Sequence, residues 1–163
     1  MCPARTFCIA VLAIAVALLP HGADAAGYSH FVSRVFHFSI DYPRGWQLKL
    51  DLKRRFQSFE FAKPGSVTVN YFSASSGLDL RTLTTHVAEA YRNSGFKTGQ
   101  LTYSHGVGRF NATAALGNQQ LQTRMVTMVR PKGLYAIDLT SFKSQFNAAV
   151  GIYNHMVASF RSG

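Results

Sequence analysis

The most chemically suggestive residues in this chain are cations that lie close together. Lys49, Lys53, Arg54 and Arg55 form one cluster, and Asp51 is the single acid among them. Such a cluster attracts phosphate and carboxylate groups, because its potential raises the local concentration of anions. The sequence therefore predicts an anion-binding rim for phospholipid, lipopolysaccharide, nucleic acid or an acidic protein. A solvated loop has the same composition and stays open as the alternative.

Two residues just before this cluster extend the candidate binding site. An exposed Trp46 beside Arg44 is typical of an interface anchor, whereas a fully buried tryptophan only fills the core. The predicted partner-binding residues are therefore Arg44, Trp46, Lys49, Lys53, Arg54 and Arg55.

Aromatic residues next to the cations raise a nucleic-acid alternative. Phe56 and Phe59 follow the cluster directly, and proteins that bind single strands stack bases on rings while cations pair with phosphates. The sequence carries no signature of a known nucleic-acid module. We therefore expect both rings in the core and keep nucleic-acid binding only as an alternative.

Catalytic and metal-binding patterns are weak in this sequence. His37 and Asp41 are expected on one face of a strand and could imitate part of a hydrolytic triad, but no Gly-x-Ser-x-Gly motif presents a nucleophile. His86 and Glu89 have helical spacing, yet a closed metal site needs three or four ligands. We predict no catalytic residues, no metal and no cofactor. A small enzyme that acts on an anionic substrate remains the alternative, with polar residues that converge only on folding.

Alternating apolar residues predict strands before any helix. Residues 36–42 and 46–53 alternate around the turn sequence Pro43-Arg44-Gly45, which predicts a hairpin. Residues 56–62 and 67–72 form a second predicted pair. Residues 26–34 fit either a lead-in or a short edge strand.

Helical periodicity marks two further segments. Asp79 can cap a helix that ends near Gly95, and a long apolar stripe between Phe142 and Phe160 predicts a terminal helix. The segments between them that are predicted as strands are 96–104, 110–116, 119–130 and 134–140. This order predicts an α+β fold, an α/β/α sandwich with a central antiparallel sheet covered by two main helices.

The N-terminal segment is typical of an export signal. Arg5 precedes an apolar run over residues 7–19, and Ala23-Asp24-Ala25 offers the small residues that signal peptidase reads. We expect cleavage after Ala25, which removes both cysteines and leaves residues 26–163 as one domain in the periplasm or outside the cell. At 163 residues, with 15% charged residues and a net charge of +10, the chain fits one folded domain that attracts anions.

Short motifs of the sequence resemble those of the PsbP-like family. The segment from Phe36 to Trp46 resembles the opening strand and Tyr-Pro-x-Gly-Trp of these domains. The segment Gly133–Ile137 and the helix ending in Met156-Val157-Ala158-Ser159-Phe160 are similar to that family's last strand and helix. The resemblance implies an α/β/α sandwich that mostly binds or helps assemble other proteins.

The known members of that family differ from this chain. They include the extrinsic subunit of photosystem II, a nuclear Ran-binding factor and bacterial envelope lipoproteins. This sequence shows neither a chloroplast-type transit segment nor a lipid-acceptor cysteine after its apolar run. We therefore expect an exported, non-enzymatic binding or assembly protein, not integral to the membrane, whose basic face meets an acidic protein or an anionic membrane surface. The sequence leaves the oligomeric state open.

Overall fold

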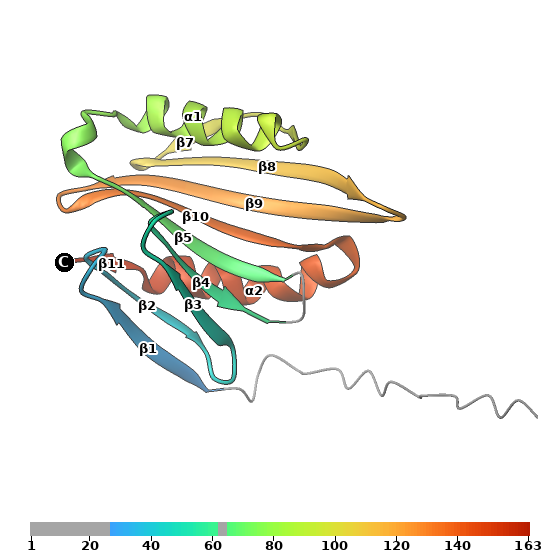
Figure 1. Cartoon of the computed structure of the whole chain (residues 1–163), viewed down its shortest axis with the longest axis horizontal. Coiled ribbons are helices and arrows are strands. Elements are labelled where there is room, and N and C mark those ends of the chain that lie inside the picture. The colour runs from blue at the N-terminus through green and yellow to red at the C-terminus, as the bar shows by residue number, and fades with distance from the viewer. Residues whose placement is uncertain (1–26, 62–64) are drawn as a thin grey trace, which may run out of the picture.

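Antiparallel strands make up most of this computed structural model, which describes residues 27–61 and 65–163 (Figure 1). The predicted signal segment lies outside the described residues. The first elements are β1 (Tyr28–Ser33), β2 (Phe38–Pro43), β3 (Gln47–Asp51), β4 (Phe56–Glu60), β5 (Ser66–Phe72), the short 3-10 helix η1 (Ala74–Ser76) and α1 (Leu80–Asn93). They are followed by β6 (Lys97–Thr98), β7 (Thr102–Ser104), β8 (Val107–Leu116), β9 (Gln119–Arg130), β10 (Gly133–Phe142), α2 (Lys143–Ser159) and β11 (Arg161–Ser162).

The described strands form two sheets. The larger sheet has the order β3-β4-β5-β10-β9-β8-β6, and β7 also pairs with β8. The smaller sheet has the order β1-β2-β11. The two long hairpins β8–β9 and β9–β10 confirm the predicted antiparallel neighbours in the second half of the chain. The fold is therefore mixed α+β, dominated by antiparallel sheet and completed by two long helices.

The predicted first hairpin is wrong. β2 pairs with β1 and β11, whereas β3 pairs with β4, so the turn after Pro43 carries the chain from one sheet to the other. β3 is the edge strand of the large sheet, and its Leu48 and Leu50 are 44% and 49% exposed. Alternation identified both strands, but it does not specify which strand pairs with which.

The structure also shows the secondary structure of two segments that the sequence left open or predicted differently. The lead-in adopts the edge-strand alternative, because β1 pairs with β2 along its whole length. The single strand expected over residues 96–104 is instead two short strands, β6 and β7, which both pair with β8.

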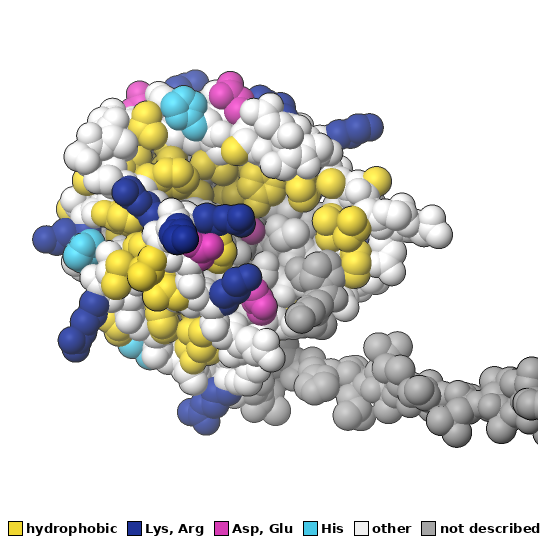
Figure 2. Space-filling model, in the orientation of Figure 1, with side chains coloured by type: hydrophobic (Ala, Val, Ile, Leu, Met, Phe, Trp, Pro, Cys, Tyr) yellow, Lys and Arg dark blue, Asp and Glu magenta, His cyan; other side chains and the backbone are white. Residues whose placement is uncertain are grey.

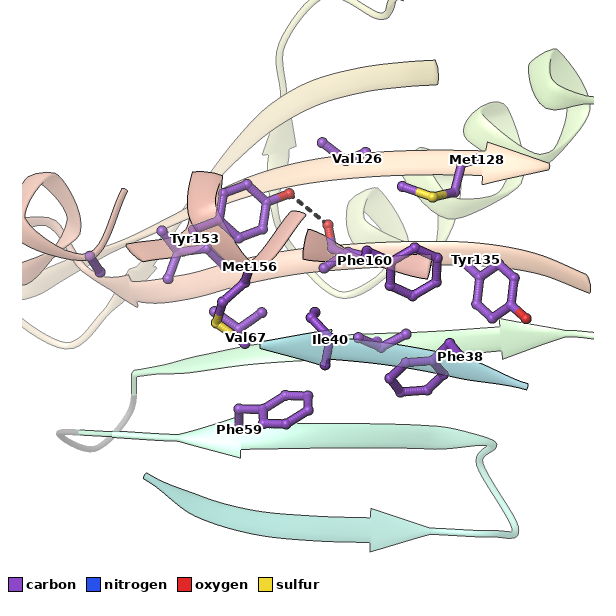
Figure 3. Packing of buried hydrophobic residues seen from close by; sticks show 14 of the residues in the cluster. Phe38, Ile40, Phe59, Val67, Val126, Met128, Tyr135, Tyr153, Met156 and Phe160 are labelled. Atoms are coloured by element: carbon purple, nitrogen blue, oxygen red, sulfur yellow. Dashed lines mark hydrogen bonds between the residues drawn. The ribbon is translucent and has the colours of Figure 1, made fainter. Parts of the chain in front are cut away.

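One face of the large sheet carries the main core. Alternate residues of β10, Tyr135, Ile137 and Leu139, point into a cluster with buried side chains of α2. The Tyr153 hydroxyl on α2 donates to the Ile137 carbonyl at 2.8 Å (Figure 3). The small sheet adds Phe38 to the same cluster. This face is therefore covered by α2 and the β1-β2-β11 sheet together.

The opposite face carries a second cluster under α1. Leu134 and Ala136 of β10 pack there with Leu83 of the helix. The Asp79 carboxylate accepts the Thr82 backbone N–H at 2.7 Å, which confirms the predicted N-cap. Gly95 has a φ of +88°, the left-handed conformation expected just beyond a helix C-terminus. α1 and α2 thus stabilise opposite faces of the large sheet (Figure 1).

Candidate functional site

The clustered cations lie in and beside the turn between β3 and β4. The Asp51 carboxylate accepts the Arg54 backbone N–H at 2.8 Å, which fixes the turn. The same carboxylate lies 4.0 Å from the Arg54 Nε, and the Arg54 side chain is 81% exposed. Arg55 follows in the left-handed region with a φ of +57°. A compact acid-capped turn therefore holds the cations at the end of an edge hairpin.

Little negative charge offsets these cations. Lys49, Lys53 and Arg55 are exposed and take part in no ion pair within residues 27–61 and 65–163. Figure 2 shows Lys and Arg side chains gathered over the β3–β4 turn, with hydrophobic side chains beside them. The arrangement can bind an anionic surface, but it presents no reactive group.

Apolar side chains accompany the cations on the same edge hairpin. Lys49 lies between two of them on β3 and therefore projects from the opposite face of the strand. Leu48 and Leu50 project from the face of β3 that carries buried Phe59 on β4, because Leu48 is paired directly with Phe59. Leu52 follows in the turn and is 59% exposed. We call this set the β3–β4 surface, which comprises Leu48, Lys49, Leu50, Leu52, Lys53, Arg54 and Arg55.

Arg44 and Trp46 lie at the other end of β3. At about 3.3 Å per residue, this end is about 13 Å from the cationic turn. The Trp46 ring stacks on Phe61 at 4.6 Å and is half-buried, while the Arg44 backbone N–H donates to the Gly27 carbonyl at 3.0 Å. The six residues predicted as one site are therefore spread along one strand. Arg44 and Trp46 lie before β3, Lys49 lies in its middle, and Lys53, Arg54 and Arg55 lie in the turn after it.

Asp41 pairs with a different histidine from His37, the one that the strand pattern suggested. His37 lies in the turn before β2 with a φ of +54°. The Asp41 carboxylate instead lies 2.7 Å from the His30 Nδ1 on β1, where the His30 side chain is exposed and the Asp41 side chain is partly buried. The Asp41 backbone N–H donates to the Ser159 hydroxyl at 2.9 Å. These contacts tie β1, β2 and α2 together and do not form a triad with His37.

The structure reveals a groove that the sequence analysis missed. It lies between α2 and the strands β8 and β9, has a volume of about 570 Å³, and is lined by Arg109 and Arg124 with Tyr153 and Asn154 of the helix. The arginines lie on neighbouring strands, fifteen positions apart in the sequence. The alternation of β8 and β9 was the available signal, but it does not reveal which face α2 leaves partly open. Burial raises the pKa of Tyr153 well above its ordinary value, against the opposing effect of the two arginines.

The most perturbed acid lies in the interior under α1. Asp138 is 5% exposed, and burial raises its pKa to about 7. Its carboxylate accepts from Thr140 and Asn70, each at 3.3 Å. Burial, together with the nearby Asp138, also raises the pKa of Tyr91. This polar cluster faces away from the groove, because Asp138 shares the α1 face of β10 with Leu134 and Ala136.

Within the described part of the chain, no three His, Cys, Asp or Glu side chains gather closely enough to hold a metal ion. Also within residues 27–61 and 65–163, no helix has both the length and the apolar character needed to span a membrane.

Comparison with known proteins shows the fold. Neither a protein-family profile nor a curated protein matches this sequence. Solved structures do match this chain, which is an antiparallel α+β domain with two long helices. Cyanobacterial PsbP (CyanoP) from Synechocystis sp. PCC 6803 aligns with a TM-score of 0.58 and 10% identity over 87% of this chain and 96% of its own. The chain therefore has a PsbP-like fold.

Two other solved structures share this architecture. A protein from Bacteroides thetaiotaomicron VPI-5482 aligns with a TM-score of 0.57 and 12% identity over 82% of this chain, which spans 48% of that longer protein. A Pseudomonas aeruginosa protein of unknown function aligns with a TM-score of 0.50 and 11% identity, over 78% of this chain and 91% of its own. At these identities the likeness establishes the fold and leaves function to the residues themselves.

Proposed function

We propose that this chain is an exported, non-enzymatic binding or assembly protein of the cell envelope, and that its β3–β4 surface docks an anionic partner. The observation that carries the proposal is the combination on one edge hairpin of exposed cations with exposed leucines. The partner is an acidic protein or an anionic membrane surface. Nucleic acid fits less well, because Phe59 is fully buried and cannot stack on bases. Phe56, which was also expected in the core, is only partly buried, so a single ring of the pair is accessible.

Three features of the β3–β4 surface favour a docking role over a role in solubility alone. A net charge of +10 steers anions toward the molecule, but only at long range. Leu48, Leu50 and Leu52 gather exposed apolar area on one hairpin, and such area beside charge is typical of an interface. The other large hydrophobic residues that are exposed in the described part of the chain lie on other elements: Val32, Val35, Leu116 and Val129. β3 also has an unpaired edge among the described strands, which gives a partner backbone groups to bind. Attraction, apolar contact and backbone pairing are therefore available in one place.

The envelope location rests on other support. The signal-like N-terminal sequence favours export, and the PsbP-like fold is compatible with a protein that acts by contact. We describe the domain as an α/β/α sandwich, since α1 and α2 pack on opposite faces of β9 and β10. Two cysteines fall before the expected cleavage point, so an oxidising compartment would not alter the mature fold.

The enzyme alternative has less support. Two perturbed titratable groups in one accessible pocket would favour it. The raised pKa values of Asp138 and Tyr91 arise in the interior under α1, whereas the groove lies against α2 on the other face. Of the groups with raised pKa values, Tyr153 lines the groove, and its hydroxyl is already bonded to the Ile137 carbonyl.

A capture experiment from envelope fractions tests the proposal. Residues 26–163 would be immobilised at about 150 mM salt, alongside the charge reversal Lys53→Glu, Arg54→Glu and Arg55→Glu. The matched control reverses three other exposed lysines, Lys97→Glu, Lys132→Glu and Lys143→Glu, and therefore has the same net charge.

The two variants separate a defined surface from general stickiness. We expect the control to retain the partner and the β3–β4 variant to lose it. Equal capture by wild type and the β3–β4 variant contradicts the proposal. Equal loss from both variants also contradicts it, because net charge alone would then account for binding. Vesicles with phosphatidylglycerol, tested in parallel, distinguish a lipid surface from an acidic protein.

A further inference from the structure

The groove beside α2 has the layout of a small-ligand site. Its volume of about 570 Å³ lies within the roughly 300–1,000 Å³ typical of ligand pockets. One wall is the sheet surface of β8 and β9, and the other is the flank of α2 formed by Asn154, Val157 and Ala158. Residues that lie three and four apart on a helix share one side, so these three side chains form a continuous wall.

Strand register brings the two arginines to this face. Arg109 is paired directly with Val126, and Asn111 is paired directly with Arg124. Val126 belongs to the core cluster beneath α2, so its neighbours Arg109 and Arg124 project from the same face of the sheet. Both guanidinium groups therefore lie on the side of the sheet where α2 forms the groove wall.

The groove is strongly biased toward anions. No acidic residue occurs among the described residues that line it. The Arg109 Nη1 donates to the Ser104 hydroxyl at 3.0 Å, and neither arginine forms an ion pair within the described part of the chain. Arginine stays charged at all physiological pH values, and its planar group binds carboxylates and phosphates through two parallel hydrogen bonds.

The remaining lining residues suggest what accompanies the anionic group. Gln100, Asn111 and Asn154 supply amide donors and acceptors, and Thr102 supplies a hydroxyl. Val126 and Val157 offer apolar contact. This combination suits a small molecule with hydroxyl groups and a carbon skeleton, as well as one anionic group.

We propose that the α2 groove binds a small hydroxylated organic anion, whose phosphate or carboxylate is held by Arg109 and Arg124. The site is separate from the β3–β4 surface, on different strands, and its ligand is one small anionic group, free or in a lipid headgroup, rather than an extended surface. The two proposals can therefore succeed or fail independently.

Isothermal titration with defined probes tests the groove. The probes are glucose 6-phosphate, citrate and inorganic phosphate, with glucose as the uncharged control. We expect glucose 6-phosphate or citrate to bind wild type, and Arg124→Gln to weaken that binding at least tenfold. Arg54→Gln removes the same charge from the β3–β4 turn and should change the affinity less than twofold.

A steric variant tests whether the ligand occupies the groove itself or is only attracted by the charge around it. Ala158 is exposed on α2, so Ala158→Phe fills the groove without changing charge or displacing the core. We expect it to abolish binding while the thermal midpoint stays within a few degrees of wild type. The proposal is overturned if no charged probe binds wild type, if Arg124→Gln and Arg54→Gln weaken binding equally, or if Ala158→Phe binds normally.

Vesicles decide whether the anionic group belongs to a lipid. Phosphatidylglycerol vesicles that bind through Arg124, and are displaced by glucose 6-phosphate, would assign the groove to a lipid headgroup. Binding of the soluble probes without such vesicle binding would assign it to a free metabolite, and both results support the groove. Vesicle binding that depends on Arg54 but not on Arg124, with no binding of soluble probes, would contradict it.

Discussion

The hydroxyl oxygens of Thr84 on α1 and Thr127 on β9 lie 2.7 Å apart, and both side chains are fully buried. Thr84 also donates to the Leu80 carbonyl at 2.6 Å within its own helix. Its single hydrogen is therefore used, so Thr127 is the donor in the contact between the two threonines. This bond joins the helix directly to the sheet.

The two threonine hydroxyls should be coupled in their effect on the free energy of unfolding. Thr84→Val leaves the buried Thr127 hydroxyl without a partner and should lower the free energy of unfolding by about 1–3 kcal/mol. The double variant Thr84→Val/Thr127→Val should lose less than the sum of the two single variants, because no orphaned hydroxyl remains. Urea unfolding of the four proteins measures the coupling. Additive losses would contradict the assigned bond.

Gly108 permits the close approach of α1 to the sheet. A Cβ atom at this position would overlap the hydroxyls of Thr84 and Thr127. Gly108→Ala should therefore lower the free energy of unfolding by about 1–3 kcal/mol. Gly151→Ala is the matched control, since Gly151 is exposed within α2 with open space around it, and the change should stabilise the protein by about 0.5–1 kcal/mol. Thermal or urea unfolding gives both values, and a neutral Gly108→Ala would contradict this packing.

Asp138 should make the fold less stable as the pH rises. Its pKa is about 7 in the folded protein and 3.8 ordinarily, so between these values the folded state holds a proton that the unfolded state has released. The contribution of this group to the free energy of unfolding is fully present below about pH 4 and is lost as the pH rises to 7. Asp138→Asn should remove that slope and gain up to about 4 kcal/mol at pH 8, at about 1.4 kcal/mol per pH unit between the two pKa values.

An acid with the opposite shift provides the control for this pH dependence. The hydrogen bond from the Thr82 N–H lowers the pKa of the Asp79 carboxyl, so its stabilising effect is lost as the pH falls through that lowered value. Asp79→Asn should therefore alter the acid side of the stability profile and leave the slope between pH 5 and 7 intact. Urea midpoints measured from pH 3 to 9 test both variants. A slope that survives in Asp138→Asn would show that another group causes it.

The exposed leucines of β3 should contribute little to stability. Leu48→Ser and Leu50→Ser should each change the free energy of unfolding by no more than about 0.5 kcal/mol, because both side chains already contact solvent. Leu83→Ala under α1 should cost about 2–5 kcal/mol, because it empties a fully buried position. Denaturant unfolding compares them. A large loss at Leu48 would mean that this side chain belongs to the core and not to a docking surface.

Local patterns predicted most of the elements. Asp79 and Gly95 marked the ends of α1 correctly, since capping depends on residues near in sequence. Phe38 and Ile40 are buried as their alternation predicted, and the apolar stripe before Phe160 does form α2. The same alternation failed for Leu48, because it records the period of a strand and not whether anything covers the strand.

The sequence by itself determined the long-range charge, the two helices, the caps of α1, most strands and the cationic turn, because each depends on composition or on neighbours along the chain. Tertiary structure alone decided that β2 and β3 belong to different sheets. It also placed Arg109 and Arg124 in one groove. Those relationships depend on strand pairing and helix docking, which bring distant residues together through burial shared across the whole fold.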